Sequence, residues 1–519
     1  MDLPDYSSMS ITSVGSIKTS FGSIAPKMLS GVDKLAVDVL GVKWLVQDAR
    51  PFATTASPSF KLYMGAASGG KYEGACYATN KSICAKLAEE AKAKSSAFLQ
   101  ELQDSGIKPC LVGDCWSEGG GKDAMGLFAV TAQGIDKDWN LKSVLVAALP
   151  CGGDSHTADF LDTATDAAME KLGFTNHVDG VMIKVADNAS VNKKAWGVEG
   201  SGMLGCGPHT LQLAAGKFLS VSEIERTLSK GSGVVGHFNR STQAKAKLRE
   251  LQKQVNAPQE NLEQHVKTRW NAGQKMCESL VRNKTPILLF DVVADSAGEV
   301  YKFNKLNTID WDLIEETTAC LKMASNATQM LEGSKYPTSS LVFPVMGMLM
   351  ADLSPSKEVI LTFRDEQDVR YKLASDQLLE PVRQGRAAML ADLKERYITN
   401  VPQNVKELLL IASILYPREG FNYLAFLSEE DSVFPAQWKQ FGKSAFERTF
   451  DIHYSPLKKS SESDVPVRSP SSVVSEFQAQ GAPKQKEVGI SFSSFFRKKA
   501  RCVCKANFFQ FVCLCLIRM

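Results

Sequence analysis

Short apolar runs separated by polar turns occupy residues 107–206, whereas apolar residues recur at helical spacing on either side of this stretch. Residues 181–185 form an apolar, β-branched run that predicts a buried strand. The run is followed by Asp187, Asn188, Ala189 and Ser190, a pattern typical of a turn and the start of a helix. A second apolar run, which ends at Asp114, predicts another strand of the same kind.

The stretch between the two aspartates predicts a hairpin followed by a helix. Residues 123–134 and 139–150 are strand-like, and residues 135–138 form the polar tip of the hairpin between them. Residues 155–174 carry apolar residues at helical spacing and a stop signal at Gly173. The predicted fold class is therefore α/β, with a mixed sheet made of a hairpin and then parallel strands. In this order the first and fourth strands are expected to lie side by side.

Five regions follow from these patterns along the chain. They are a loose N-terminal segment (1–28), a helical N-terminal region (29–105), the α/β core (106–216), a helical insertion with a late helical region (217–450) and a disordered or non-native tail (451–519). Within the tail, residues 455–486 are rich in Ser, Pro and charge, which favours disorder. Residues 495–519 are abruptly apolar, and their Cys-x-Cys pairs are closer than metal-binding pairs usually are.

Composition narrows the function classes only slightly. The 519 residues carry a formal net charge of +3, so charge alone predicts no bulk affinity for polyanions. The 12 cysteines lack regular spacing and favour free thiols in a reducing compartment. The N-terminus lacks the pattern of a secretory signal, and no run approaches the ~20 apolar residues of a membrane helix. We therefore expect no membrane partner.

Asp114 and Asp187 are the candidate metal ligands, because each follows a predicted buried strand. Carboxylates at the carboxyl ends of neighbouring strands meet at the edge of a sheet where α/β sites form. Their hard oxygen atoms suit Mg²⁺ or Mn²⁺. Two such ions can activate a nucleophile and stabilise the leaving oxygen in phosphodiester cleavage. The alternative is that both aspartates only cap turns.

Five segments, in order and spacing, resemble the transposases of the hAT superfamily. They are "VGDCWSEG", "VADNASVNKKA", "GCGPHTLQLAA", "VKTRWNAGQKM" and a late region that includes "LLLIASILYPREGF". The likeness covers roughly residues 30–425, and Tyr416 stands where the late segment usually has an aspartate. It implies a ribonuclease-H-like core that carries a large all-helical insertion.

The resemblance also assigns roles to single residues. Asp114 and Asp187 match the family's first and second catalytic aspartates, and Cys206 and His209 match its Cys-x-x-His motif. Arg269 and Trp270 match its Thr-Arg-Trp segment. These last four are candidate DNA-binding residues. The alternatives are a packed or hydrogen-bonded His209 and a core Trp270; on the functional interpretation, Trp270 stacks on an unpaired base.

The chain departs from the family in three places. No two Cys and two His before Asp114 have the spacing of the BED-type zinc finger with which family members often begin. The third catalytic acid is matched only remotely, by Glu447 in "KSAFERTF", where a solvated surface glutamate is the alternative. The dimerisation region is not recognisable, so a homo-oligomer stays open.

The sequence therefore predicts a nuclear, transposase-derived protein whose partner is DNA. By ancestry its activity is metal-dependent DNA cleavage and strand transfer, the reactions of DNA recombination by a transposable element. Without a secure third acid, we expect this activity to be weak or absent. The alternative is a non-catalytic nuclear factor that uses the same fold to bind DNA or protein.

Overall fold

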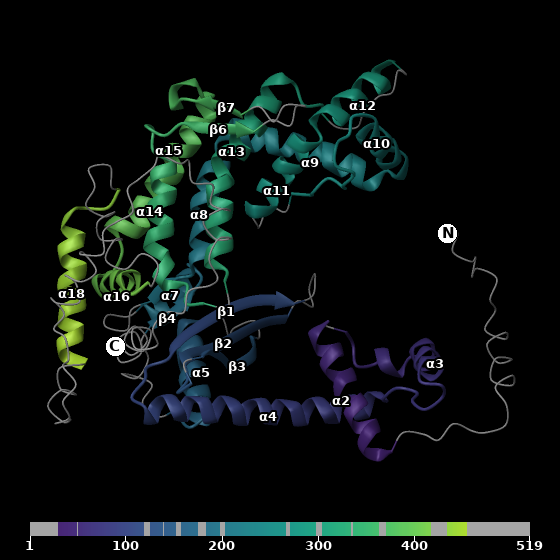
Figure 1. Cartoon of the computed structure of the whole chain (residues 1–519), viewed down its shortest axis with the longest axis vertical. Helices are drawn as coiled ribbons and strands as arrows, with labels where there is room; N and C mark the ends of the chain where they lie inside the picture. The colour runs from purple at the N-terminus through teal and green to yellow at the C-terminus, as the bar shows by residue number, and fades with distance from the viewer. Residues whose placement is uncertain are drawn as a thin grey trace, which may run out of the picture. The chain divides into compact units, whose positions relative to one another are not determined.

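The computed structural model describes most of the chain between residues 30 and 453. The described ranges are 30–48, 50–118, 125–138, 140–151, 157–174, 183–197, 203–265, 270–296, 304–333, 336–362, 370–416 and 433–453. The chain divides into two compact units, Met1–Ser95 and Ser96–Met519. Figure 1 shows the elements of both.

The first unit is helical. Its elements are α2 (Gly31–Gln47), η1 (Thr54–Ala56), α3 (Pro58–Ala67) and the first part of α4 (Tyr77–Asp104), which continues into the second unit. Ser30 and Ser57 cap α2 and α3 by accepting hydrogen bonds from backbone N–H groups in the first turn. The Asn80 side chain donates to the Phe52 carbonyl over 2.9 Å and so ties α4 to the loop before η1.

A five-stranded mixed sheet forms the centre of the second unit. Its strands are β1 (Cys110–Glu118), β2 (Met125–Ile135), β3 (Leu141–Cys151), β4 (Ile183–Ala186) and β5 (Met203–Gly205), in the order β3-β2-β1-β4-β5. β1, β2 and β3 pair antiparallel, whereas β1 with β4 and β4 with β5 are parallel. The predicted α/β class, the hairpin and the contact between first and fourth strands are confirmed.

Local chemistry explains the hairpin tip and the helix that follows. Asp136 accepts hydrogen bonds from the backbone N–H groups of Asp138 and Asn140 and pairs with Lys142 over 2.7 Å. The next helix, α5 (Ala158–Lys171), ends before Gly173, whose φ of +84° is accessible to glycine at little cost.

Alternate residues of the strands serve two separate cores. Leu111, Cys115 and Ala186 pack into a core that includes side chains of α5 and of α7 (Ser190–Trp196). On β4, Ile183 and Val185 point to the face opposite to that of Ala186 and pack into the larger core of the helical region. Since side chains alternate along a strand, these contacts identify the face on which each strand residue lies.

The helical region follows β5. Its elements are α8 (Gly207–Leu219), α9 (Ser222–Arg240), α10 (Thr242–Gln254), α11 (Trp270–Arg282), α12 (Lys284–Ser296), α13 (Thr308–Leu331), η3 (Ser339–Leu341), α14 (Val342–Asp352), η4 (Ser375–Gln377), α15 (Glu380–Lys394), the π-helical turn η5 (Glu395–Thr399), α16 (Gln403–Ile414) and α18 (Gln437–His453). In Figure 1, α8, α13, α14 and α15 run side by side, in agreement with their packing contacts. Among the described residues, no helix is long and apolar enough to cross a membrane.

The expectation of an all-helical insertion was wrong. β6 (Val359–Thr362) and β7 (Arg370–Leu373) form an antiparallel pair within the helical region. The cause is local: Val359 and Leu361 are buried while Ile360 between them is half exposed, which is the two-residue period of a strand.

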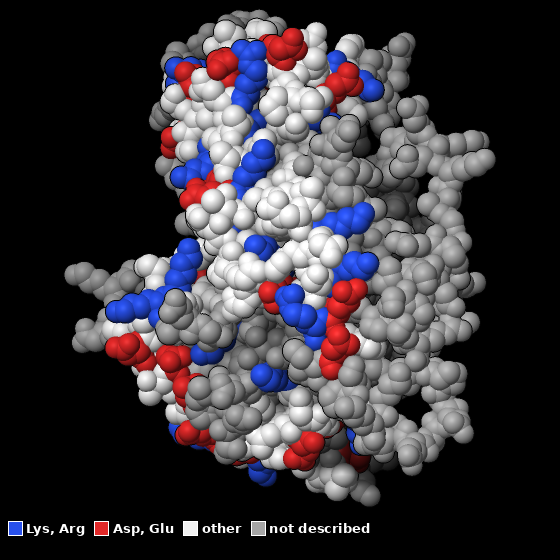
Figure 2. All heavy atoms as spheres, turned by 90° about the vertical axis from the view of Figure 1, so that its left-hand side faces the viewer, with Lys and Arg blue, Asp and Glu red and all other residues white. Residues whose placement is uncertain are grey.

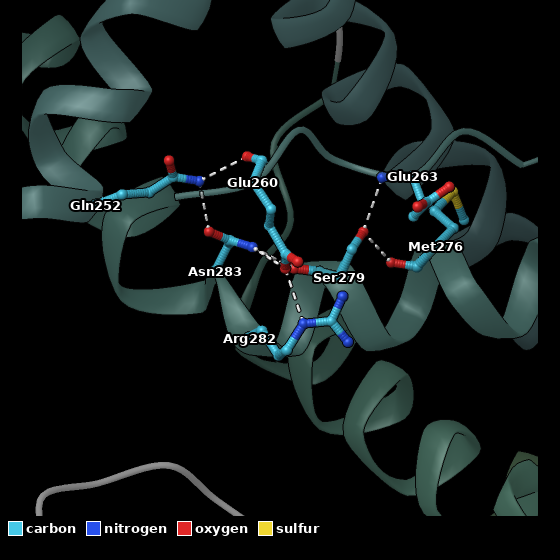
Figure 3. Close-up of polar contacts among 7 residues, drawn as sticks. All are labelled: Gln252, Glu260, Glu263, Met276, Ser279, Arg282 and Asn283. Carbon is cyan, nitrogen blue, oxygen red and sulfur yellow. Dashed lines mark hydrogen bonds and ion pairs between the residues drawn. The ribbon is translucent and has the colours of Figure 1, made fainter. Parts of the chain in front are cut away.

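A polar clamp holds the extended segment between α10 and α11 (Figure 3). Asn283 accepts a hydrogen bond from Gln252 over 2.8 Å and donates to the Glu260 carboxylate over 3.2 Å. Arg282 donates to the same carboxylate over 2.8 Å, and Ser279 accepts from the backbone N–H of Glu263. Gln252 and Asn283 are fully buried. The clamp therefore gives hydrogen-bond partners to the Gln252 side-chain nitrogen and to both polar atoms of the Asn283 side chain, which water does not reach.

Candidate functional site

Asp114 and Asp187 lie at matched positions on neighbouring parallel strands. The last register pair between β1 and β4 is Val112 with Val185, and each aspartate stands two residues further on. Side chains two residues apart on a strand point to the same face. Asp114 and Asp187 are therefore on the same face as Val112 and Val185, which is the face that packs on the helical region. Neighbouring strands are ~4.8 Å apart, so the two backbones run close together at this point.

The two aspartates differ in their surroundings. Asp114 is exposed and lies within β1, which continues to Glu118 because it still pairs with β2 there. Asp187 is half-buried and follows the last residue of β4. The apolar run before Asp114 thus marked the end of the parallel pairing and not the end of the strand.

Hydrogen bonds fix the Asp187 carboxylate. Its Oδ1 atom accepts from the backbone N–H of Ala189 over 2.8 Å and from the side chain of Asn192 over 2.7 Å. Its Oδ2 atom makes no hydrogen bond with the described residues. Asn192 is buried and belongs to the segment "DNASVN", but we assigned it no role from the sequence.

Cys206 and His209 complete this end of the sheet. The Cys206 backbone N–H donates to the Ala186 carbonyl over 2.6 Å, and Cys206 stands at the N-cap of α8. The pKa of His209 is raised, first by a hydrogen bond with Cys206 and further by the charges of Cys206, Asp114 and Asp187, while burial opposes the rise. His209 therefore shares the electrostatic surroundings of both aspartates.

The charges of the same two carboxylates also affect the pKa of Cys115 on β1. Its pKa is raised to about 11, chiefly by burial and then by the charges of Cys151, Asp187 and Asp114. The structure thus brings Asp114, Asp187, Cys206 and His209 together where the parallel pairing of β1, β4 and β5 ends.

A cleft of about 1050 Å³ opens beside Asp187, along the edge strand β5. Asn188 and Thr210 line it, and the Asn188 side chain donates to the Thr210 hydroxyl over 2.9 Å. η5 and the start of α16 supply further lining residues, including Tyr397. Burial, the largest cause, raises the pKa of Tyr397. π-Helical turns often occur at functional sites, but no sequence pattern predicted this one.

The remaining predicted residues lie elsewhere. Trp270 is only 5% exposed and belongs to the core of the helical region, which fits the core alternative and does not present its ring to a base. Arg269 lies outside the described residues. Glu447 is half-buried on α18, a helix that packs against α16, and the neighbouring Arg448 pairs with Glu407 there.

Asp114 and Asp187 have carboxylate oxygens, the ligand type that hard cations prefer. Mg²⁺ is commonly bound through one or two carboxylates and keeps several waters. Asp114 is exposed, and the Oδ2 atom of Asp187 makes no hydrogen bond with a described residue, so both carboxylates have an oxygen to offer. Within the described ranges, no three or more His, Cys, Asp or Glu side chains are grouped so as to hold a metal ion.

Surface charge is mixed. On the face drawn in Figure 2, basic side chains lie among acidic ones and do not gather into one broad patch. Near neutrality of the whole chain agrees with this distribution. The described part of this face does not have the rows of cations that duplex DNA binding usually uses.

Comparison with known proteins finds a family model that matches part of the helical region. The family model "ZBED1 RNase-like helical domain" matches residues 204–320, from β5 to α13. The chain is similar to this domain over those residues.

Two curated relatives match about half of the chain. "Zinc finger BED domain-containing protein 4" of Homo sapiens is 26% identical over 263 residues, which are 50% of this chain and 19% of that protein. "Putative transcriptional regulator tpeD" of Talaromyces stipitatus is 24% identical over 317 residues, which are 54% of this chain and 36% of that protein. The chain thus spans well under half the length of either relative.

Proposed function

We propose that this chain is a nuclear, nucleic-acid-binding protein derived from a hAT transposase, with a ribonuclease-H-like core. The strand order and the adjacency of β1 and β4 support this fold assignment. The family match over 204–320 supports the ancestry. The names of the two relatives, one a BED zinc finger protein and the other a transcriptional regulator, favour DNA as partner and the nucleus as location.

The observation that carries the proposal is the matched placement of Asp114 and Asp187 on one face of adjacent parallel strands. Together they would hold Mg²⁺ or Mn²⁺, and a bound ion would polarise a phosphodiester and activate water. Asn192 and the N–H of Ala189 hold Asp187 in place for that task. Cys206 and His209 lie at the same sheet edge, where they would orient the site or the DNA.

We further propose that cleavage and strand transfer are weak or absent in this chain. Phosphodiester cleavage with two metal ions takes more ligands than two aspartates provide. Glu447 is the one residue whose sequence surroundings resemble the third acid, and its helix packs on α16. An error of ~1 Å in placing a reacting group can cost ~10²-fold in rate.

The second candidate function is a non-catalytic DNA- or protein-binding factor on the same fold. The name of the fungal relative, a transcriptional regulator, favours it. Under this alternative the aspartates serve no hydrolytic step. Homo-oligomerisation stays a prediction under both.

A nicking and strand-transfer assay with Mn²⁺ tests the catalytic part. The proteins are the chain as given, Asp114→Asn, Glu447→Gln and, as a control on the same helix, Asp451→Asn. We expect little or no cleavage by any of them. Strong cleavage lost in Asp114→Asn and Glu447→Gln but kept in Asp451→Asn would show that Glu447 completes an active site. Strong cleavage kept in Asp114→Asn would refute the role of the aspartate pair.

A further inference from the structure

The residues on both sides of Asp187 are hydrogen-bonded to the start of α8. Before it, the Ala186 carbonyl accepts from the backbone N–H of Cys206 over 2.6 Å. After it, the Asn188 side chain donates to the Thr210 hydroxyl over 2.9 Å. The Thr210 hydroxyl in turn donates to the Cys206 carbonyl over 2.9 Å. These three bonds close a hydrogen-bonded ring, in which Asp187 is the middle residue of the segment 186–188.

Thr210 is the residue on which this hydrogen-bonded ring depends. Its side chain is only 4% exposed, so water has little access to replace the partners of the hydroxyl. A hydroxyl has one donor and two acceptor sites. The donor site serves Cys206 and one acceptor site serves Asn188, which leaves one acceptor site. Burial raises the pKa of Tyr397 on η5, and a hydrogen bond with Thr210 opposes that rise.

Gly205 on β5 leaves room for the Asn188 side chain. An added Cβ atom at Gly205 would lie 2.6 Å from Oδ1 of Asn188, so the amide lies directly against the strand. Its nitrogen atom is bonded to Thr210 on the other side. The amide is therefore held between β5 and α8, and a shift of it would move the backbone directly after Asp187.

Two sets of hydrogen bonds thus act on Asp187. The bonds from Ala189 and Asn192 fix its carboxylate relative to α7. The hydrogen-bonded ring fixes the backbone around Asp187 relative to α8. A metal ligand needs both kinds of support, because its oxygen must lie within a few tenths of an ångström of the right distance from the ion.

We propose that Thr210 is a positioning residue for the metal site: through Asn188 it holds Asp187 where that carboxylate and Asp114 can bind one ion. Thr210 acts on the ion only through other residues. This inference rests on the metal binding proposed above for the aspartate pair. It adds a residue to which the sequence motifs assigned no role.

The Mn²⁺ affinity of the full chain, measured by titration calorimetry, tests this role without any need for cleavage. Thr210→Val replaces the hydroxyl with a methyl group of similar size. Loss of an outer partner of a metal ligand typically weakens metal binding roughly 10- to 100-fold, and we expect the lower end of this range because Thr210 acts through Asn188. Thr210→Ser keeps the hydroxyl and should bind Mn²⁺ like the wild type.

Thr328→Val is the matched control. Thr328 is 2% exposed on α13, and its hydroxyl donates to the carbonyl of Ala324 four residues earlier over 3.0 Å, as Thr210 does to Cys206. Its removal should leave the Mn²⁺ affinity unchanged. Circular dichroism shows whether each variant is folded.

A double-mutant cycle shows whether Thr210 acts through Asn188. Asn188→Ala should weaken Mn²⁺ binding about as much as Thr210→Val. The double variant should bind no more weakly than the weaker single variant, because both changes break the same hydrogen bond. Additive losses would mean that Thr210 does not act through Asn188.

Hydrogen exchange followed by mass spectrometry gives a readout without metal. Peptides that cover residues 186–192 should exchange faster in Thr210→Val than in the wild type, because the hydrogen-bonded ring that holds this segment is broken. The same peptides should be unchanged in Thr328→Val. Unchanged exchange in Thr210→Val would show that the hydrogen-bonded ring does not hold the segment.

The outcomes separate the two proposals. If the wild type binds Mn²⁺ and Thr210→Val binds it equally well, the positioning role is wrong and the metal site stands. A loss of the same size in Thr328→Val would also refute the positioning role. If the wild type binds no Mn²⁺, both proposals fail. Should Thr210→Val not fold, Tyr397→Phe takes its place: weaker Mn²⁺ binding supports the positioning role, and unchanged binding refutes it.

Discussion

Replacing Gly113 with alanine should displace Asp114 through a clash on the opposite face of β1, although no carboxylate is changed. An added Cβ atom at Gly113 would lie 2.2 Å from Cη2 and 2.6 Å from Cζ3 of Trp196. Carbon atoms in contact are about 3.5–4.0 Å apart, so ring or strand must move by roughly 1.5 Å. Trp196 is 2% exposed and packs against Phe128 at 6.2 Å between ring centroids, so the ring has little room to turn. We therefore expect β1 to shift and Asp114 to move with it.

The expected cost is about 1–3 kcal/mol of unfolding free energy, the usual range for overpacking a core. Urea unfolding followed by circular dichroism measures it, and calorimetry measures the loss of Mn²⁺ affinity. Gly216→Ala is the control, because a Cβ atom there meets nothing within 4 Å. It should leave stability unchanged or raise it by up to about 1 kcal/mol, as expected inside helix α8.

A double-mutant cycle identifies the cause. Trp196→Leu alone should destabilise the protein by leaving a cavity, but in that background Gly113→Ala should cost much less than in the wild type. An unchanged cost would mean that Trp196 is not the obstacle. A Gly113→Ala variant as stable as the wild type, with full Mn²⁺ affinity, would show that Gly113 is not needed for the packing of β1 or for the position of Asp114.

Three further predictions concern the clamp, the hairpin and salt dependence. Asn283→Ala should cost about 2–4 kcal/mol in urea unfolding, since it removes three buried hydrogen bonds (Figure 3); a loss below ~1 kcal/mol would contradict the role of the clamp. Burial opposes the change, but hydrogen bonds with Lys142 and Asn140 lower the pKa of Asp136 from 3.8 to about 2. Its contribution is therefore present above pH 3.8 and lost as the pH falls through 2, so Asp136→Asn should flatten the stability profile between pH 4 and 2; a profile identical to that of the wild type would argue against it. Duplex DNA should bind weakly, with little sequence preference and a steep loss of affinity with salt; tight, selective binding at physiological salt would overturn this.

The hydrophobic pattern predicted the strands of the central sheet well, because their positions depend on short-range sequence features. The runs before Asp114 and Asp187, the hairpin at 135–138 and the helix stop at Gly173 depend on local chemistry, which the sequence shows directly. Adjacency of the first and fourth strands followed from the element order. β6 and β7 escaped notice because each has only four residues, too short for periodicity to stand out within a helical region.

The site was less predictable, because its parts come from distant segments. Asp114, Asp187, Cys206 and His209 were found through motif resemblance, and the roles assigned to them stay predictions. Exposure could not be inferred from the sequence: Trp270 is in a core, whereas Trp116, in the segment that carries Asp114, is exposed. The cleft depends on α16 and η5 approaching β5, about two hundred residues apart in sequence, and no local pattern encodes that approach.

A Mn²⁺-binding measurement shows whether Asp114 and Asp187 together hold a divalent ion. Electron paramagnetic resonance counts the bound ions in the wild type, Asp114→Asn, Asp187→Asn and a control, Asp159→Asn, at an exposed position in the first turn of α5. We expect a bound ion in the wild type and in Asp159→Asn, and its loss in either of the other two variants. Binding that survives both Asp114→Asn and Asp187→Asn, or no binding by the wild type, would contradict it.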